Sequence, residues 1–290
     1  MNSELFSKKE KVLPNFLGIG VKRGGTTWLY EVLKRHPKIF LCPYIKETRF
    51  FDKNYNKGIK WYKKFFPNQY EAKKYAAIGE IVPTYLCYEH VPKLVQKILP
   101  SALFIIMLRN PVERALSEYK YDKLNFGLKD SFEIYLRKNP EVIEMGYYAK
   151  QIKYWLKYFP LNRFLILTFE EVMNNKIGSL KKISKFLNIE LKDFNFQSLN
   201  KKINISDLPK MHKIYLIGYK INDIIIAKDL YRLSDILSRF KPFLYILGNK
   251  KNKNNIDPNV KRALYLKYKE DIAELEIILN MNFKLWEINF

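Results

Sequence analysis

The chain has 290 residues, 48% of them hydrophobic and 16% aromatic, which is enough to bury a sizeable core and excludes a disordered protein. It carries 52 lysines and arginines against 29 acidic residues, a formal net charge of +23. That excess indicates a polyanionic partner, such as a nucleic acid, an acidic glycan, a phosphorylated cofactor or an anionic membrane surface.

The cysteines, histidines and apolar runs narrow the class further. Nothing about Cys42 and Cys87 requires a disulfide, and a reduced cytosolic setting is the simpler interpretation. The three histidines are dispersed, so we expect no metal site. The polar N-terminus is unlike a signal peptide, and no apolar run approaches the ~18 residues that span a bilayer. We therefore expect a cytoplasmic protein, whose basic surface also permits peripheral contact with the inner face of an anionic membrane.

The first predicted element is a buried strand at residues 16–21, which leads through the basic glycine loop 22–25 into a helix that begins at Thr26. A strand, a glycine loop and a helix N-terminus together bind anions through backbone N–H groups. The spacing from Gly20 to Gly25 nearly matches the phosphate-binding loop of nucleotide hydrolases, but Thr26 occupies the position of its lysine. The cations lie within the loop instead, so the segment predicts an anion site of a different kind.

Residues 46–49, Lys-Glu-Thr-Arg, form a charged segment that runs into two phenylalanines. One interpretation is a solvated turn before a buried aromatic pair. The other is a carboxylate, Glu47, that Lys46 and Arg49 flank close to the glycine loop. Taken alone, the segment favours the solvated turn and leaves the second interpretation open.

The run at 103–108 is apolar throughout and predicts a strand that is buried on both faces of a parallel sheet. It ends at Arg109, and in the helix that follows Asn110 can cap the first turn and Ser117 can add a hydroxyl donor. In nucleotide hydrolases a comparable strand often ends in an aspartate that helps to hold magnesium. Arginine at this position predicts a second anion site and argues against metal-assisted triphosphate chemistry.

Strands and helices alternate from residue 16 to residue 188, which is typical of the α/β class with a central parallel sheet flanked by helices. The other strands are predicted at 39–41, 76–83 and 163–169, and the other helices at 58–67, 91–99, 112–121, 131–137, 146–159 and 177–187. We expect residues 16–188 to form the α/β core that contains the anion sites.

From about residue 195 the chain becomes mainly helical, and we expect 195–290 to complete a single domain that spans 1–290. An amphipathic helix is predicted at 260–279, and Trp286 is expected to fix the C-terminus to the core. The basic loop 248–255 is either a solvated segment or a mobile lid over a phosphate.

Five motifs, in this order and spacing, resemble the sulfotransferases that use 3′-phosphoadenosine-5′-phosphosulfate (PAPS), and within them the carbohydrate branch of heparan-sulfate and bacterial polysaccharide enzymes. The motifs are Gly20-Val-Lys-Arg-Gly-Gly-Thr-Thr-Trp-Leu29, His36-Pro37, Lys46-Glu47-x-x-Phe50-Phe51-Asp52, Gly79-Glu80-x-x-Pro83-x-Tyr85 and Leu108-Arg109-Asn110-Pro111-x-x-Arg114-x-x-Ser117-x-Tyr119. The resemblance implies a P-loop-like three-layer fold, PAPS as co-substrate, adenosine 3′,5′-bisphosphate as product and no required metal.

The resemblance also implies roles for individual residues. Glu47 falls on the catalytic base, which takes a proton from the acceptor hydroxyl or amine as sulfur is attacked in line. Lys22 or Arg23 assists the leaving phosphate; the family commonly has lysine where this chain has Arg23, and a guanidinium does not readily donate a proton. The residues assigned to PAPS are Lys22, Arg23, Gly24, Gly25, Thr26, Thr27, Trp28, Arg109 and Ser117, with Lys250, Lys251 and Lys253 assigned by position only. The residues assigned to the acceptor are Lys46, Arg49, Glu80 and Tyr85.

The acceptor that this resemblance implies is a glycan, a glycolipid or another compound with a hydroxyl or an amine, and no specific nucleic acid. Two other functions stay open. A P-loop-type phosphotransferase or kinase would need a lysine at position 26 and an acidic strand end, and the chain has neither. A basic protein that binds RNA or a membrane surface is suggested by the net charge and by the interleaved tyrosines and lysines of residues 210–253.

Overall fold

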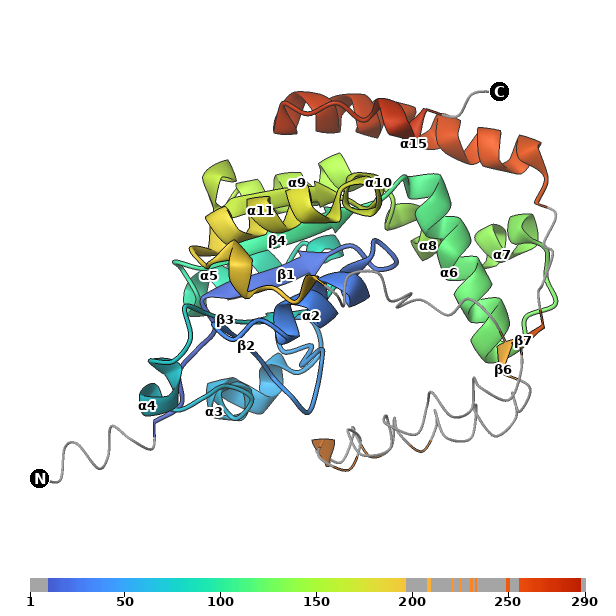
Figure 1. Ribbon diagram of the computed structural model, residues 1–290. Coiled ribbons are helices and arrows are strands. Elements are labelled where there is room, and N and C mark those ends of the chain that lie inside the picture. The colour runs from blue at the N-terminus through green and yellow to red at the C-terminus, as the bar shows by residue number, and fades with distance from the viewer. Residues whose placement is uncertain are drawn as a thin grey trace, which may run out of the picture.

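The computed structural model describes residues 10–196 and 256–287, together with isolated positions between 208 and 250. Its centre is a parallel sheet of five strands in the order β2-β3-β1-β4-β5 (Figure 1). The strands are β1 (Phe16–Gly20), β2 (Ile39–Leu41), β3 (Ala77–Ile81), β4 (Leu103–Leu108) and β5 (Phe164–Thr168). Because β1 and β4 are parallel neighbours, the glycine loop and Arg109 leave the sheet side by side at the same edge.

The side chains of each strand alternate between two apolar cores, one on each face of the sheet. In β4, Ile105 and Met107 belong to one core, and Phe104 and Ile106 belong to the other. Both faces are apolar because helices cover both, which is the arrangement that a continuous apolar run predicts. The prediction of a three-layer α/β fold around a parallel sheet is confirmed.

The two cores are covered by different helices (Figure 1). The core that contains Met107 is covered by α2 (Thr26–Lys34) and α11 (Lys176–Leu187). The other core is covered by α5 (Val91–Ile98), α6 (Pro111–Phe126), α9 (Tyr148–Leu156) and α15 (Pro258–Leu279). The structure also contains α3 (Gly58–Lys63), α4 (Gln69–Ala72), α7 (Phe132–Lys138), α8 (Pro140–Glu144), α10 (Phe169–Asn174) and the paired short strands β6 (Leu208–Pro209) and β7 (Asn249–Lys250). Its 3₁₀ turns include η1 (Tyr55–Lys57), η2 (Tyr85–Cys87), η3 (Leu161–Arg163), η4 (Leu191–Asp193) and η6 (Lys284–Trp286).

Helix α6, which carries Ser117 toward the site, shows where local signals set a boundary. It begins where predicted, because Asn110 Oδ1 accepts hydrogen bonds from the N–H groups of Val112 at 3.0 Å and Glu113 at 3.3 Å. It extends beyond the predicted end near residue 121, because the helix terminates only at Gly127, which adopts a left-handed φ of 67°. The longer helix adds a further turn of side chains beside the glycine loop.

The C-terminal segment returns to the sheet edge where β4 ends. Helix α15 packs against α9 and α6 through a buried stripe that consists of Leu264, Tyr268, Ile272, Leu275 and Leu279. The indole Nε1 of Trp286 donates to Glu170 Oε2 at 3.0 Å, and its carbonyl accepts from Asn110 Nδ2 at 2.9 Å. The prediction that Trp286 fixes the C-terminus to the core is confirmed. The single domain over 1–290 stays a prediction, since most of 197–255 lies outside the described residues.

Within residues 10–196 and 256–287, no helix combines the length and the apolar composition that crossing a bilayer requires. The same parts of the chain contain no group of three or more histidine, cysteine and carboxylate side chains arranged to hold a metal ion. Cys42 is a buried free thiol, and Cys87 is a partly buried one.

Candidate active site

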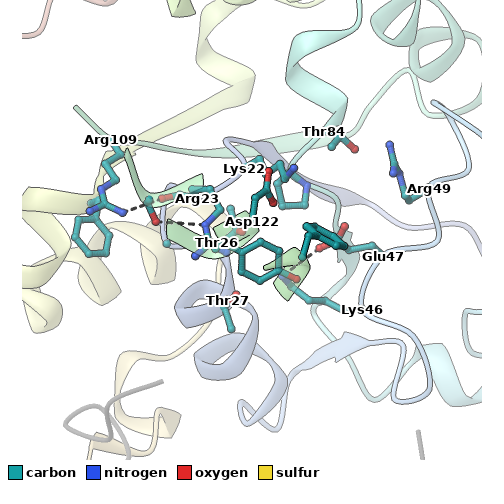
Figure 2. Close-up of a pocket in the computed structure, with 16 residues that line it drawn as sticks. Lys22, Arg23, Thr26, Thr27, Lys46, Glu47, Arg49, Thr84, Arg109 and Asp122 are labelled. Carbon is teal, nitrogen blue, oxygen red and sulfur yellow. Dashed lines mark hydrogen bonds and ion pairs between the residues drawn. The ribbon is translucent and has the colours of Figure 1, made fainter. Parts of the chain in front are cut away.

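A pocket of about 540 Å³ opens at the edge of the sheet where β1 and β4 end and α2 begins. It brings together the predicted residues Lys22, Arg23, Gly25, Thr26, Thr27, Lys46, Glu47, Arg49, Arg109 and Ser117. Figure 2 shows Arg109 and Arg23 toward one end of the pocket and Glu47, with Lys46 and Arg49, toward the other. Of the two interpretations of the charged segment, the structure therefore supports a carboxylate close to the glycine loop.

The glycine loop places the start of helix α2 at the pocket. Gly25 is the N-cap residue, with a left-handed φ of 96° that favours glycine, and as a glycine it has no side chain to cap the helix. Thr26 and Thr27, the first residues of the helix, line the pocket. The first N–H groups of a helix have no partner within it, and the helix dipole adds partial positive charge there. This end of α2 is therefore suited to bind an anion.

Gly24 was predicted to contact the donor, but within the loop it is the residue that packs against β4, where it is buried and does not line the pocket. A Cβ atom at Gly24 would lie 2.4 Å from the carbonyl oxygen of Met107 and 2.6 Å from Val21 Cγ2.

We expect Gly24→Ala to lower the free energy of unfolding by about 2–3 kcal/mol, because the loop must move away from β4. Urea denaturation measures the loss. The control is Gly127→Ala, whose Cβ meets no atom within 4 Å and which should cost about 1 kcal/mol for its positive φ. Equal losses in the two variants would contradict the packing argument.

Arg23 connects the glycine loop to α6. Its guanidinium carbon lies 4.5 Å from the ring centroid of Tyr121, and its Nε donates to Ser117 Oγ at 3.3 Å. Burial lowers the pKa of Arg23, although an arginine stays charged at physiological pH. A positive charge with reduced solvation interacts strongly with an anion, so Arg23 is a strong cation of this site.

Arg109 lies beside Arg23 at the end of β4. Its Nη1 donates to the carbonyl oxygen of Arg23 at 3.2 Å, and its guanidinium carbon lies 4.5 Å from the ring centroid of Phe169. Burial lowers the pKa of Arg109 as well, and its Nε has no hydrogen-bond partner among the described residues. A buried donor without a partner costs about 1–3 kcal/mol. This end of the pocket therefore favours a ligand that supplies oxygen acceptors.

Lys22, the other cation of the loop, is held by a buried carboxylate. Its Nζ lies 2.5 Å from Glu118 Oε1, and the other oxygen of Glu118 pairs with the fully buried Arg114. Burial opposes the ionisation of Glu118, but the charges of Arg114 and Lys22 hold its pKa below the ordinary value. The side chain of Lys22 is 41% exposed, so its ammonium has a defined place and stays accessible from the pocket.

The opposite end of the pocket carries Glu47. Its Oε1 pairs with Lys46 Nζ at 3.2 Å. Arg49 is oriented by Asp52, whose Oδ2 accepts from Arg49 Nη2 at 2.6 Å and from the Thr84 hydroxyl at 2.7 Å. Burial opposes the charge of Arg49, but Asp52 raises its pKa above the ordinary value. One carboxylate flanked by two cations thus faces the arginine pair across the pocket (Figure 2).

Two residues predicted to contact the acceptor lie elsewhere. Glu80 and Tyr85 are only 2% and 0% exposed, and neither lines the pocket. The reason is that every residue of β3, Glu80 included, is buried within the layers of the fold, and Tyr85 is buried in the 3₁₀ turn η2 that follows. The prediction of direct acceptor contact is therefore corrected: Glu80 accepts hydrogen bonds from Thr48, and Tyr85 from the N–H of Phe51, so both support the segment that carries Glu47.

Trp28 is also placed differently from its predicted contact with the donor. Trp28 is 4% exposed and belongs to the apolar face of α2. This face points toward the sheet, so the indole packs in the core between the helix and the sheet. Lys251 and Lys253 lie outside the described residues, and of Lys250 only the backbone pairing with Leu208 is described. The predicted roles of these three lysines stay predictions.

Burial raises the pKa of Glu80 from its ordinary value of 4.5 to about 7. Between these two values the folded state binds more protons than the unfolded state, so the free energy of unfolding falls as pH rises through this window. We expect the Glu80 contribution to decline by roughly 3 kcal/mol from pH 4.5 to pH 7. Urea denaturation of the wild type and of Glu80→Gln across this range measures it, because the glutamine does not titrate. A difference in stability between the two proteins that does not change with pH would contradict the prediction.

The pocket also contains side chains that the sequence analysis missed: Pro83, Thr84, Tyr121, Asp122, Phe126 and Phe169. For two of them, Tyr121 and Phe169, a pattern in the sequence could have indicated a place in the pocket. Tyr121 follows Ser117 by four positions, which is one helical turn and thus the same face of α6. Phe169 directly follows β5, at the edge where the adjacent strand β4 delivers Arg109.

The fold and the pocket together define a P-loop-like α/β protein in which a glycine loop suited to bind an anion lies beside the arginine that ends the next strand, with a carboxylate across the pocket from both. A family model described as a sulfotransferase domain matches residues 13–221, so the chain belongs to the sulfotransferase family. The predicted resemblance to sulfotransferases is confirmed at the level of this family.

Individual relatives agree with this assignment. Heparan sulfate glucosamine 3-O-sulfotransferase 3A1 of Mus musculus is 30% identical over 195 residues, which cover 64% of this chain and 48% of that protein. Heparan sulfate glucosamine 3-O-sulfotransferase 5 of Homo sapiens is 31% identical over 194 residues, 61% of this chain and 54% of that protein. The chain thus spans about half the length of the curated relatives it matches. A sulfotransferase from Alicyclobacillus acidocaldarius shares the fold, with a TM-score of 0.67 and 21% identity over 95% of this chain and 99% of that one.

Proposed function

We propose that the chain transfers the sulfuryl group of PAPS to a hydroxyl or an amine of a glycan or glycolipid acceptor, with Glu47 as the base. The observation that carries the proposal is the pocket in which Glu47 faces Lys22, Arg23 and Arg109. Group transfer needs these opposite ends, because the nucleophile loses a proton where a carboxylate lies and the leaving phosphate gains charge where cations lie.

The donor end suits a co-substrate with two anionic groups. The start of α2, with Lys22 and Arg23, is suited to the 5′-phosphosulfate, and Arg109 with Ser117 is suited to the 3′-phosphate. Two partly desolvated guanidinium groups support this assignment, and so does Arg109 Nε, which has no partner within the described part of the chain. The product that stays at this end is adenosine 3′,5′-bisphosphate.

The chemistry follows from the side chains at each end. Glu47 takes the proton of the acceptor as its oxygen or nitrogen attacks sulfur in line, and a positioned carboxylate contributes about 10²–10⁴-fold to such a step. We assign the proton donor for the leaving phosphate to Lys22, because an ammonium releases a proton more readily than a guanidinium does. Arg23 stabilises the negative charge that develops there. The proposal includes no metal ion, since these residues supply the positive charge.

The acceptor class is proposed from the relatives and from the charge around Glu47. Relatives of this chain are heparan sulfate glucosamine 3-O-sulfotransferases. Lys46 and Arg49 beside Glu47 would bind anionic groups of a glycan on either side of the reacting hydroxyl or amine. A cytoplasmic location, with peripheral contact at the inner face of an anionic membrane, stays a prediction from the sequence.

The experiment that tests the proposal is incubation with sulfur-labelled PAPS and a panel of glycans, glycolipids and small phenols. Label transfer to a glycan or glycolipid is the expected result, and transfer to phenols alone would replace the acceptor class. No transfer and no binding of the bisphosphate would overturn the proposal. Magnesium-dependent ATP turnover would instead indicate a phosphotransferase, and steeply salt-dependent RNA binding without affinity for the bisphosphate would indicate a nucleic-acid-binding protein.

A further inference from the structure

Beneath the acceptor end of the pocket, a buried carboxylate holds the segment that carries Glu47. This carboxylate belongs to Glu80, which is 2% exposed. Its Oε2 accepts from the backbone N–H of Thr48 at 3.3 Å and from the Thr48 hydroxyl at 2.6 Å. Its Oε1 accepts from the hydroxyls of Tyr62 at 2.7 Å and Tyr85 at 3.1 Å. One oxygen of Glu80 thus bonds to the segment with Glu47, and the other bonds to two tyrosines of the core.

We propose that Glu80 is a positioning residue, which orients the carboxylate of Glu47 through the peptide group that joins Glu47 to Thr48; this inference rests on the proposed function. The N–H that Glu80 accepts belongs to that peptide, so the hydrogen bond fixes its plane and the direction in which Glu47 leaves the backbone. Two further bonds hold Thr48: Asn54 Nδ2 donates to its carbonyl at 2.8 Å, and the N–H of Phe50 donates to its hydroxyl at 3.2 Å. Glu47 therefore extends into the pocket from a backbone that is held at the residue directly after it, Thr48.

The hold on Thr48 is strongest when Glu80 is ionised. A carboxylate accepts from all of its partners at once, whereas a protonated carboxyl must donate its own hydrogen and accepts more weakly. The groups that face Glu80 are Thr48, Tyr62 and Tyr85, and the thiol of Cys42 lies close enough for its pKa to respond to the charge. Because burial raises the pKa of Glu80 to about 7, the orientation of Glu47 responds to pH near neutrality.

Four variants separate positioning from general support. Glu80→Gln removes the charge, Thr48→Val removes the hydroxyl at constant size, and Thr48→Ser keeps it. Tyr62→Phe is the matched control, because it removes one hydroxyl from the other oxygen of the same carboxylate. We expect Glu80→Gln and Thr48→Val to lower kcat by about 10- to 100-fold, since a misplaced catalytic group costs up to this much. Thr48→Ser and Tyr62→Phe should stay within about threefold of the wild type, and the affinity for adenosine 3′,5′-bisphosphate should not change in any variant.

Two further measurements report on positioning itself. The kcat of the wild type should fall below about pH 7, and this limb should be absent in Glu80→Gln. Amide hydrogen exchange of residues 46–52, followed by mass spectrometry, should accelerate in Glu80→Gln and Thr48→Val but not in Tyr62→Phe. Equal losses of kcat in Thr48→Val and Tyr62→Phe, or a Thr48→Val turnover within twofold of the wild type, would overturn the inference.

The experiments distinguish an error in the proposed function from an error in the role of Glu80. A wild-type protein that neither transfers label from PAPS nor binds the bisphosphate would refute the sulfotransferase assignment. The exchange measurement needs no substrate, so unchanged exchange in Glu80→Gln would refute the hold of Glu80 on the segment whatever the activity.

Discussion

Glu47→Gln is expected to lower sulfuryl transfer by about 10²- to 10⁴-fold, because the amide cannot accept the proton of the acceptor. The variant should bind adenosine 3′,5′-bisphosphate as the wild type does, since Glu47 lies at the end of the pocket opposite Arg109 (Figure 2). Label transfer from PAPS measures the first effect, and isothermal titration calorimetry measures the second.

The matched control for this variant is Glu31→Gln on α2. Glu31 pairs with Arg35 at 3.3 Å and its side chain is 32% exposed, whereas Glu47 pairs with Lys46 at 3.2 Å and its side chain is 33% exposed. The two carboxylates are thus alike in pairing and exposure, and they differ in that Glu47 lines the pocket and Glu31 does not. We expect Glu31→Gln to keep full activity. Turnover of Glu47→Gln close to that of the control would remove Glu47 as the base.

Arg109→Ala should weaken binding of adenosine 3′,5′-bisphosphate by roughly 100-fold, or about 3 kcal/mol, which is the upper range for one hydrogen bond to a charged group. The physical reason is that Arg109 is partly desolvated and that its Nε lacks a partner among the described residues. The variant also loses the hydrogen bond to the carbonyl of Arg23, so the glycine loop loses support from β4. Calorimetry at a fixed salt concentration measures the change in Kd.

Arg163→Ala is the control for charge and for a lost backbone contact. Arg163 donates to the carbonyl oxygen of Ser101 at 3.0 Å, as Arg109 donates to that of Arg23, but it lies just before the opposite, N-terminal end of its strand, β5. Its removal lowers the net charge by the same amount and should leave the Kd unchanged. A Kd for Arg109→Ala within threefold of the Arg163→Ala value would exclude Arg109 from the 3′-phosphate site.

The α/β core was predictable because its signals are local. The continuous apolar run of β4 requires cover on both faces, which only a layered parallel sheet supplies. The glycines and cations at 22–25 indicate an anion site without reference to the rest of the chain, and Asn110 caps the helix after Arg109 as its type and position predict. The same locality explains the one boundary error in α6, where Gly127 had to be recognised as the end of the helix.

The orientation of individual side chains was not predictable in the same way. Glu80 and Trp28 belong to motifs that also supply residues of the pocket, such as Pro83 and Thr26, yet both are buried in the layers between helix and sheet. A sequence motif gives the order and spacing of residues. Which of those side chains faces the pocket and which faces the core depends on the elements that pack against the strand or helix. The partners of Lys22 and Glu80 lie on other elements, α6 and the segment after β2, so their roles follow from contacts between distant parts of the chain.

The sequence by itself determined the layered α/β fold, and it predicted anion sites at the glycine loop and at Arg109, because apolar periodicity, glycine spacing and capping residues act over a few positions. Only the tertiary structure decided that Glu47 faces these cations across one pocket and that Glu80 lies beneath it as a support. The physical reason is that the strand order makes β1 a neighbour of both β3 and β4. The distances between side chains on different strands depend on this order, and no single segment of the sequence specifies it.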